Sequence, residues 1–413
     1  MIAKVLRLAT IGIFLSIAGC ADIASLLSTP TPVSVTQTLA TPQPVELTAT
    51  SAIPSIEARV LRIWLPPRFD PNLDSASAQL LKQRLSDYEE MHPGLKIEVR
   101  LKAETGETSL LNSLLLTSNA APSALPDLIA LPRADLDAAA ARGLLHPMDG
   151  LSTLLDDPNW YPYARDLGHI QNIGYGLPFA GDMLAMVLQQ ADTGISTWDD
   201  LFLLEEPFIF PASDPQSLFP LYLYLSAGGK INNELGLPTL EEEPLQQTLT
   251  LLKAGVEASV FSTSLVDVDT FDEAFLAYRA GPARAVVAWS ANRELNENEV
   301  AQPLPGLDTS STFADGWLWA LAGTSPENQQ LATELAEYLM EPEFLTAWTV
   351  ESGFLPTRIT RAHALHGILE SAQELPARDA LNFLGPILNQ AVSRVLNGEP
   401  VEVVVRSVIE QVK

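Results

Sequence analysis

Residues 174–182 read Gly-Tyr-Gly-Leu-Pro-Phe-Ala-Gly-Asp, and the rest of the chain can be organised around them. Three glycines and a proline interrupt regular structure here, whereas Leu177 and Phe179 are apolar enough to lie against a core. On both sides, short apolar runs alternate with helical patterns, which is typical of a mostly parallel sheet covered by helices. We therefore predict an α/β protein of two lobes joined by crossing hinge strands, with a ligand site at the junction.

Length and charge limit the classes of function. A chain of 413 residues is long enough for about two domains. Its 51 acidic and 24 basic residues give a net charge of −27, which argues against nucleic acid as a partner. The single cysteine excludes a disulfide framework within one chain. No nucleophile elbow, zinc helix or phosphate-binding loop occurs, so we predict no catalytic residue, metal or cofactor.

The first residues have the pattern of a cleaved leader. Lys4 and Arg7 precede an apolar run that is short for a membrane span. The run ends in Ile-Ala-Gly before Cys20, which resembles the lipobox of bacterial lipoproteins. The resemblance implies a signal peptide over residues 1–19 and a lipid anchor on Cys20, at the outer face of the cytoplasmic membrane.

A stalk is predicted after the anchor. Residues 20–57 are rich in Thr, Pro and Ser and have almost no apolar periodicity. Such composition favours extended conformations, which reach about 3.1 Å per residue. We expect the stalk to hold the lobes away from the lipid and to add no stability.

Strand and helix patterns then alternate along the chain. Strands are predicted at 59–65, 95–101, 128–131, 183–188, 208–210, 285–289 and 316–320. Helices are predicted between most of them. Thr197 and Asp200 form a capping-box pattern at the start of one helix, and Thr239 with Glu242 suggests the cap of another.

The order of these motifs resembles a known family. Pro93-Gly94-Leu95, Pro126-Asp127-Leu128, Arg142-Gly143-Leu144, Tyr175-Gly-Leu-Pro178 and Gly353-Phe-Leu-Pro356 resemble motifs of the extracellular solute-binding proteins of ABC importers, in the maltose-binding-protein-like group. The resemblance implies one lobe from residues 58–176 with about 291–323, and a second from 177–290 with about 324–413. It also implies a monomer that delivers solute to the transmembrane subunits of a permease.

Candidate ligand-binding residues follow from strand ends and from the resemblance. Asp182 falls where the family places a ligand-contacting carboxylate. Arg68 and Asp70 follow the first strand, and Arg133 and Asp135 follow the strand at 128–131. These carboxyl-terminal ends face the crevice of open α/β sheets. Four aromatic candidates could supply flat surfaces for a sugar: Phe179, Trp317, Trp289 and Trp64.

The sequence thus predicts a lipid-anchored binding protein, not an enzyme, that captures a small solute such as a sugar or oligosaccharide. Two alternatives remain open. One is a surface lipoprotein of the same fold with a sensory or partner-binding role, which Leu131 and Pro132 leave open because they replace a sugar-stacking aromatic and its neighbour. The other is a glycan-active enzyme.

Overall fold

The computed structural model describes residues 59–189, 195–291, 295–296, 298–308, 312–361 and 365–412. These all belong to one unit, Ile56–Lys413. The predicted leader, Cys20 and the stalk lie outside the described residues. No helix within the described ranges has the length and apolar character needed to cross a membrane.

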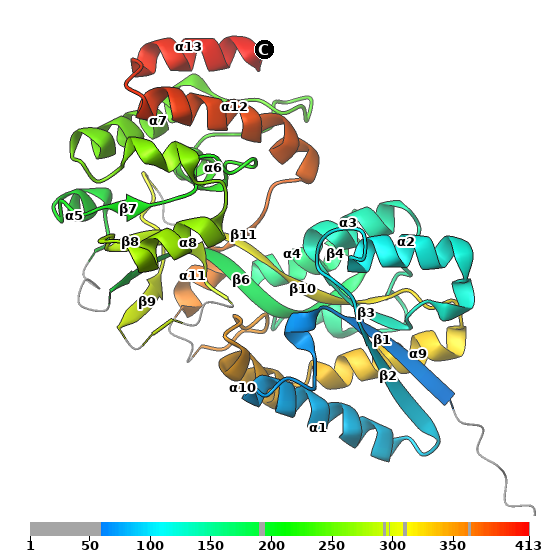
Figure 1. Ribbon diagram of the computed structural model, residues 1–413. Helices are drawn as coiled ribbons and strands as arrows, with labels where there is room; N and C mark the ends of the chain where they lie inside the picture. Colours follow the sequence, from blue (N-terminus) through cyan, green and yellow to red (C-terminus); the bar gives the residue numbers. More distant parts are fainter. Residues whose placement is uncertain are drawn as a thin grey trace, which may run out of the picture. The chain divides into compact units, whose positions relative to one another are not determined.

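Nine strands form one mixed sheet, in the order β2-β1-β3-β10-β6-β8-β7, with β11 beside β10 and β9 beside β6 (Figure 1). The strands of this sheet are β1 Arg59–Leu65, β2 Leu95–Leu101, β3 Leu128–Pro132, β6 Gly176–Gln189, β7 Phe208–Ile209, β8 Ala285–Trp289, β9 Glu299–Gln302, β10 Phe313–Leu321 and β11 Gln373–Glu374. A separate two-stranded sheet pairs β4 His169–Ile170 with β5 Ile173–Gly174. The pairs β1–β2, β1–β3, β7–β8 and β10–β11 are parallel. The α/β prediction is confirmed.

Strand β6 connects the two parts of the sheet. Its first half, Gly176 to Met183, pairs with β10, and its second half, Leu184 to Gln189, pairs with β8 and β9. Strand β10 in turn pairs with β3 on its other side. Residues 176–182 of the segment that the sequence marked as a crossing therefore form the first part of β6, the longest strand in the described residues, whereas Gly174 ends β5.

Helices cover both parts of the sheet (Figure 1). They are α1 Ala76–Met91, α2 Leu110–Ala120, α3 Arg133–Ala141, α4 Pro162–Gly168, α5 Trp198–Phe202, α6 Leu218–Ser226, α7 Glu242–Glu257, α8 Phe271–Ala280, α9 Pro326–Leu339, α10 Pro342–Ser352, α11 His366–Ser371, α12 Arg378–Leu396 and α13 Val401–Gln411. The capping box of Thr197 and Asp200 is present at α5, as predicted. The predicted Thr239 cap is wrong, because α7 has Glu241 at its N-cap and no side-chain cap.

The glycines of the crossing permit close packing. A Cβ atom on Gly181 would lie 2.2 Å from Tyr163 Oη, and one on Gly316 would lie 2.7 Å from the carbonyl oxygen of Ala180. Neither glycine has a positive φ. These positions need glycine because β6, β10 and α4 approach one another too closely for a side chain.

Two large hydrophobic clusters divide the described chain. The first contains buried residues of β1, β3, α1–α4 and also of α9 and α10, such as Leu335 and Trp348. The second gathers α5–α7, α12 and α13 against β7 and β8. The lobe boundaries stay a prediction, but this packing favours assigning α9 and α10 to the first lobe and not, as predicted, to the second.

Candidate ligand site

A cavity of about 400 Å³ lies between elements of the two clusters. Residues of α3 and α4 line one side, and Gln216 with the start of α12 lines the other. The lining residues are Arg133, Ala134, Asp137, Leu167, Ile170, Gln171, Gln216, Asp315, Glu374, Leu375, Pro376, Ala377, Arg378 and Leu381. Its volume falls in the range of sites for small molecules.

Arg133 lies at one wall of the cavity and makes four polar contacts there. Its Nη1 atom donates hydrogen bonds to the carbonyl oxygens of Asp166 and Leu167, both at 2.7 Å. Its Nε atom donates to Asp137 at 3.0 Å, and Nη1 lies 3.5 Å from Glu374 Oε2. Arg133 thus ties the start of α3 to the end of α4 and to β11, the short strand that leads to α12.

Two acidic side chains lie side by side on the neighbouring strands β6 and β10. Asp182 on β6 lies directly opposite Asp315 on β10 in the antiparallel register. Side chains at directly opposed positions project to the same face of a sheet. Asp315 lines the cavity. The register therefore places the predicted residue Asp182 beside a residue of the cavity lining.

Asp182 is fixed by three donors that converge on one oxygen. Its Oδ1 atom accepts hydrogen bonds from Ala291 N at 2.7 Å, Met183 N at 2.8 Å and Ser290 Oγ at 3.0 Å. Burial raises the pKa of Asp182 to about 7, although these donors oppose the rise; the charge of Asp315 adds to it. Burial likewise raises the pKa of Asp315 to about 6, against the opposing effects of Gly316 N–H and Arg133.

The loop before α6 brings Gln216 to the cavity. Asp214 accepts hydrogen bonds from Gln216 N and Leu218 N, at 3.1 and 2.9 Å. Ser217 Oγ donates to the carbonyl oxygen of Gly385 on α12 at 2.9 Å. A Cβ atom on Gly385 would lie 2.4 Å from the carbonyl oxygen of Pro215, so glycine allows this loop to lie directly on α12.

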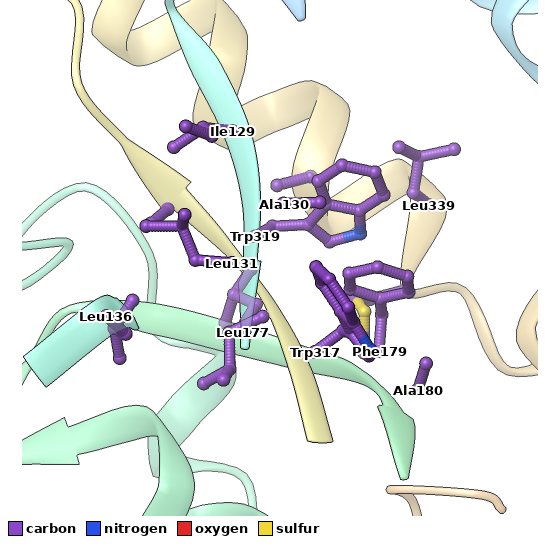
Figure 2. Packing of buried hydrophobic residues seen from close by; sticks show 14 of the residues in the cluster. Ile129, Ala130, Leu131, Leu136, Leu177, Phe179, Ala180, Trp317, Trp319 and Leu339 are labelled. Carbon is purple, nitrogen blue, oxygen red and sulfur yellow. The ribbon is translucent and has the colours of Figure 1, made fainter. Parts of the chain in front are cut away.

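Two predicted aromatic residues, Phe179 and Trp317, belong to the first hydrophobic cluster. Figure 2 shows both rings with Trp319, on the side of the strands where Leu339 lies. Phe179 stacks on Trp319 with 4.3 Å between ring centroids, and Phe69 contacts both predicted rings edge-on, at 5.2 and 5.3 Å. Phe179 is 3% exposed and Trp317 is 8% exposed, so both rings are largely covered by neighbouring side chains.

The remaining predicted residues are dispersed. Arg68 pairs with Glu104 and lies over the Trp317 ring, 5.4 Å from its centroid. Asp70 accepts hydrogen bonds from Asn72. Trp289 ends β8 beside Leu184 and contacts Phe271 edge-on. Trp64 is 2% exposed in the first core.

Asp135 lies on α3 with Arg133, but it does not line the cavity. Burial raises the pKa of Asp135, and the charges of Arg378 and Arg142 partly oppose that rise. Of the nine predicted ligand residues, only Arg133 lines the cavity, and Asp182 is one strand away from it.

Sequence reasoning missed Gln216, Asp315, Glu374 and Arg378. Gln216 follows β7 by a few residues, so the strand-end rule that selected Arg133 could also have selected it. Asp315 immediately precedes Gly316 and Trp317, which the sequence had placed on a returning strand. No sequence pattern marked Glu374 and Arg378 as site residues, because only the path of the chain from β11 to α12 brings them to the cavity.

No group of three or more His, Cys, Asp or Glu side chains in the described part of the chain is arranged to hold a metal ion. The arrangement offers hydrogen-bond donors and acceptors in a cavity lined from two sides, at crossing strands. These are the features of a protein that binds a small solute between two lobes.

The sequence comparison agrees with this class. Residues 83–376 match the family described as bacterial extracellular solute-binding protein, so the chain belongs to that family. The resemblance stated from the motifs is confirmed. The search of curated proteins found no match.

Solved structures share the fold. The maltodextrin-binding protein MalE1 from L. casei BL23 has a TM-score of 0.67 at 14% identity, over 86% of this chain and 99% of that one. MalE3 of T. maritima, solved with maltose, has a TM-score of 0.64 at 15% identity, over 86% and 99%. The cyclic α-maltosyl-1,6-maltose binding protein from Arthrobacter globiformis has a TM-score of 0.66 at 15% identity, over 86% and 97%. The predicted two-lobed, maltose-binding-protein-like fold is therefore confirmed.

Proposed function

We propose that this protein is the lipid-anchored solute receptor of an ABC importer and that it captures a carbohydrate in the cavity between its lobes. The observation that carries the proposal is the cavity itself. Polar groups line it from both sides, and the chain belongs to a solute-binding family. Carbohydrate is supported by the ligands named for structures of the same fold, which include maltose and maltotetraose. Delivery to permease subunits follows from the family's role.

The polar lining suits hydroxyl groups. The amide of Gln216 and the guanidinium of Arg378 can donate, whereas the carboxylates of Asp315 and Glu374 can accept. Asp182 is proposed as a further acceptor, because its three donors occupy Oδ1 only. Among the residues predicted from the sequence, we retain Asp182 and Arg133 in the proposed site, with Asp135 as a neighbour of Arg133.

A thermal-shift screen tests the proposal. Neutral mono- and oligosaccharides, including maltose and maltotetraose, are added to the mature protein, and the melting temperature is recorded. A bound ligand at 100 times its Kd adds about 2.7 kcal/mol to the free energy of unfolding. We expect at least one saccharide to raise the melting temperature, and a panel without any such rise would contradict the carbohydrate assignment.

The anchor needs its own test. Cells expressing the full chain are labelled with a palmitate analogue, and the protein is isolated. Label on the wild type and its loss from Cys20→Ser are expected. Label that persists in Cys20→Ser would contradict anchoring through this cysteine.

A further inference from the structure

The cavity lacks the surfaces on which neutral sugars commonly stack. Of its lining residues, all of which the structure describes, none is aromatic. The rings of Phe179 and Trp317, which the sequence offered for stacking, contact other aromatic rings instead. Selectivity in this cavity must therefore depend on charge and hydrogen bonding more than on stacking.

The charges that line the cavity are unequal. Asp137, Asp315 and Glu374 contribute three carboxyl groups, whereas Arg133 and Arg378 contribute two guanidinium groups. Arg133 donates to Asp137 at 3.0 Å and uses Nη1 on two backbone carbonyls, so its contact with Glu374, at 3.5 Å, is the longest of the four. Asp137 is therefore compensated better than the other two.

Arg378 forms no ion pair with Asp315 or Glu374, all three of which the structure describes, and the ion pair that Glu374 makes is with Arg133. Arg378 begins α12 and is exposed at the edge of the cavity, and its charge acts on Asp135, which lies outside the lining. Asp315 has Gly316 N–H as its hydrogen-bond donor, at 2.7 Å. Glu374 and Asp315 both line the cavity, and the charge of Glu374 helps to raise the pKa of the Asp315 carboxyl group, so these two acidic groups are neighbours.

We infer that the cavity selects saccharides that carry a protonated amine, which binds at Asp315 and Glu374, over saccharides that carry a carboxylate. The inference rests on the proposed function and specifies its ligand class. An ammonium group supplies three donors and adds a positive charge beside two carboxylates that share only Arg133. A uronic acid would instead place a third negative charge beside them, which is unfavourable in a partly buried site.

Three monosaccharides that share most of their hydroxyl groups separate these effects. Glucosamine, glucose and glucuronate are titrated calorimetrically into the mature protein at pH 7, with maltose as a fourth, neutral probe. We expect the Kd for glucosamine to be at least tenfold below that for glucose, and the Kd for glucuronate to exceed both.

Two variants and one control assign the preference to the cavity. Asp315→Asn and Glu374→Gln should each reduce the ratio of the glucose Kd to the glucosamine Kd by severalfold. Glu343→Gln removes an exposed carboxylate that lies on α10, away from the cavity, and should leave the ratio unchanged. Glu374 is exposed, so Glu374→Gln tests the inference even if Asp315→Asn fails to fold.

The outcomes distinguish this inference from the function on which it rests. Binding of maltose or glucose without a preference for glucosamine overturns the inference and leaves the proposed carbohydrate receptor intact. The same holds if the preference is present but persists in both variants. If no saccharide binds, both the inference and the carbohydrate assignment are overturned.

Discussion

Replacing Asp182 with asparagine tests the electrostatics of the crossing strands. An asparagine in the same position keeps an Oδ1 acceptor for Ala291 N, Met183 N and Ser290 Oγ. It removes the charge that lies opposite Asp315. The substitution therefore separates the cost of ionising this carboxyl group from the value of its hydrogen bonds.

The sign of the effect follows from the pKa. The pKa of Asp182 is raised from 3.8 to about 7 in the folded protein, so folding favours the protonated group. The stability that the protonated group contributes to the folded protein is fully present below about pH 4 and is lost as the pH rises to about 7. At about 1.4 kcal/mol per pH unit, a shift of this size corresponds to a loss of at most about 4 kcal/mol. Asp315 titrates in both proteins and is common to the comparison.

Urea unfolding between pH 4 and pH 8 measures this difference. We expect the free energy of unfolding of Asp182→Asn, relative to wild type, to increase by several kcal/mol across that range. Asp379→Asn, which removes an exposed carboxylate on α12, is the control and should follow the wild-type curve. If Asp182→Asn also follows the wild-type curve, burial does not raise the pKa of the Asp182 carboxyl group in the folded protein, and our explanation is wrong.

Three other perturbations give distinct results. Gly181→Ala should lower the free energy of unfolding by about 1–3 kcal/mol in urea titrations, because its Cβ atom would clash with Tyr163 Oη. Gly367→Ala is the control and should be close to neutral, because the space around Gly367 is open. Equal effects of the two substitutions would show that close packing at Gly181 does not matter. Arg133→Ala should cost about 1.5–3 kcal/mol by the same assay because its guanidinium joins α3, α4 and β11; an unchanged midpoint would mean that these contacts contribute nothing. Protein that begins at Glu57 should melt like the full mature chain, and a drop of many degrees would show that the stalk packs on a lobe.

Much of the fold could be predicted from local patterns. The ranges predicted for the strands at 59–65 and 285–289 match β1 and β8 to the residue, because each is a short apolar run between clear turn signals. The capping box at Thr197 was equally local. The cap at Thr239 failed because tertiary contacts hold that loop: Thr239 N donates to the carbonyl of Ile231, and Glu241 N donates to Tyr224 Oη.

The site could be predicted only in part. Arg133 could be predicted because it follows a strand whose carboxyl end can be recognised in the sequence. Gln216 and Arg378 are brought together by the packing of a loop on Gly385 and by the path from β11 into α12, which no local pattern records. The aromatic candidates show a different limit of the sequence. Trp64 was predicted as a ring that stacks on the ligand, but it is only 2% exposed and lies in the core.

The most direct test of the central claim is to fill the cavity. Ala134 is exposed and lines the cavity from the first turn of α3, so Ala134→Trp would occupy the space without replacing a core side chain. Ala347→Trp adds the same ring to a surface groove on α10 and serves as the matched control.

The saccharide that gives the largest thermal shift is titrated calorimetrically into wild type and both variants, after equal melting temperatures without ligand have been established. We expect Ala134→Trp to bind at least tenfold more weakly than wild type and Ala347→Trp to bind like wild type. Wild-type affinity in Ala134→Trp would contradict the claim that the solute binds in the cavity between the lobes.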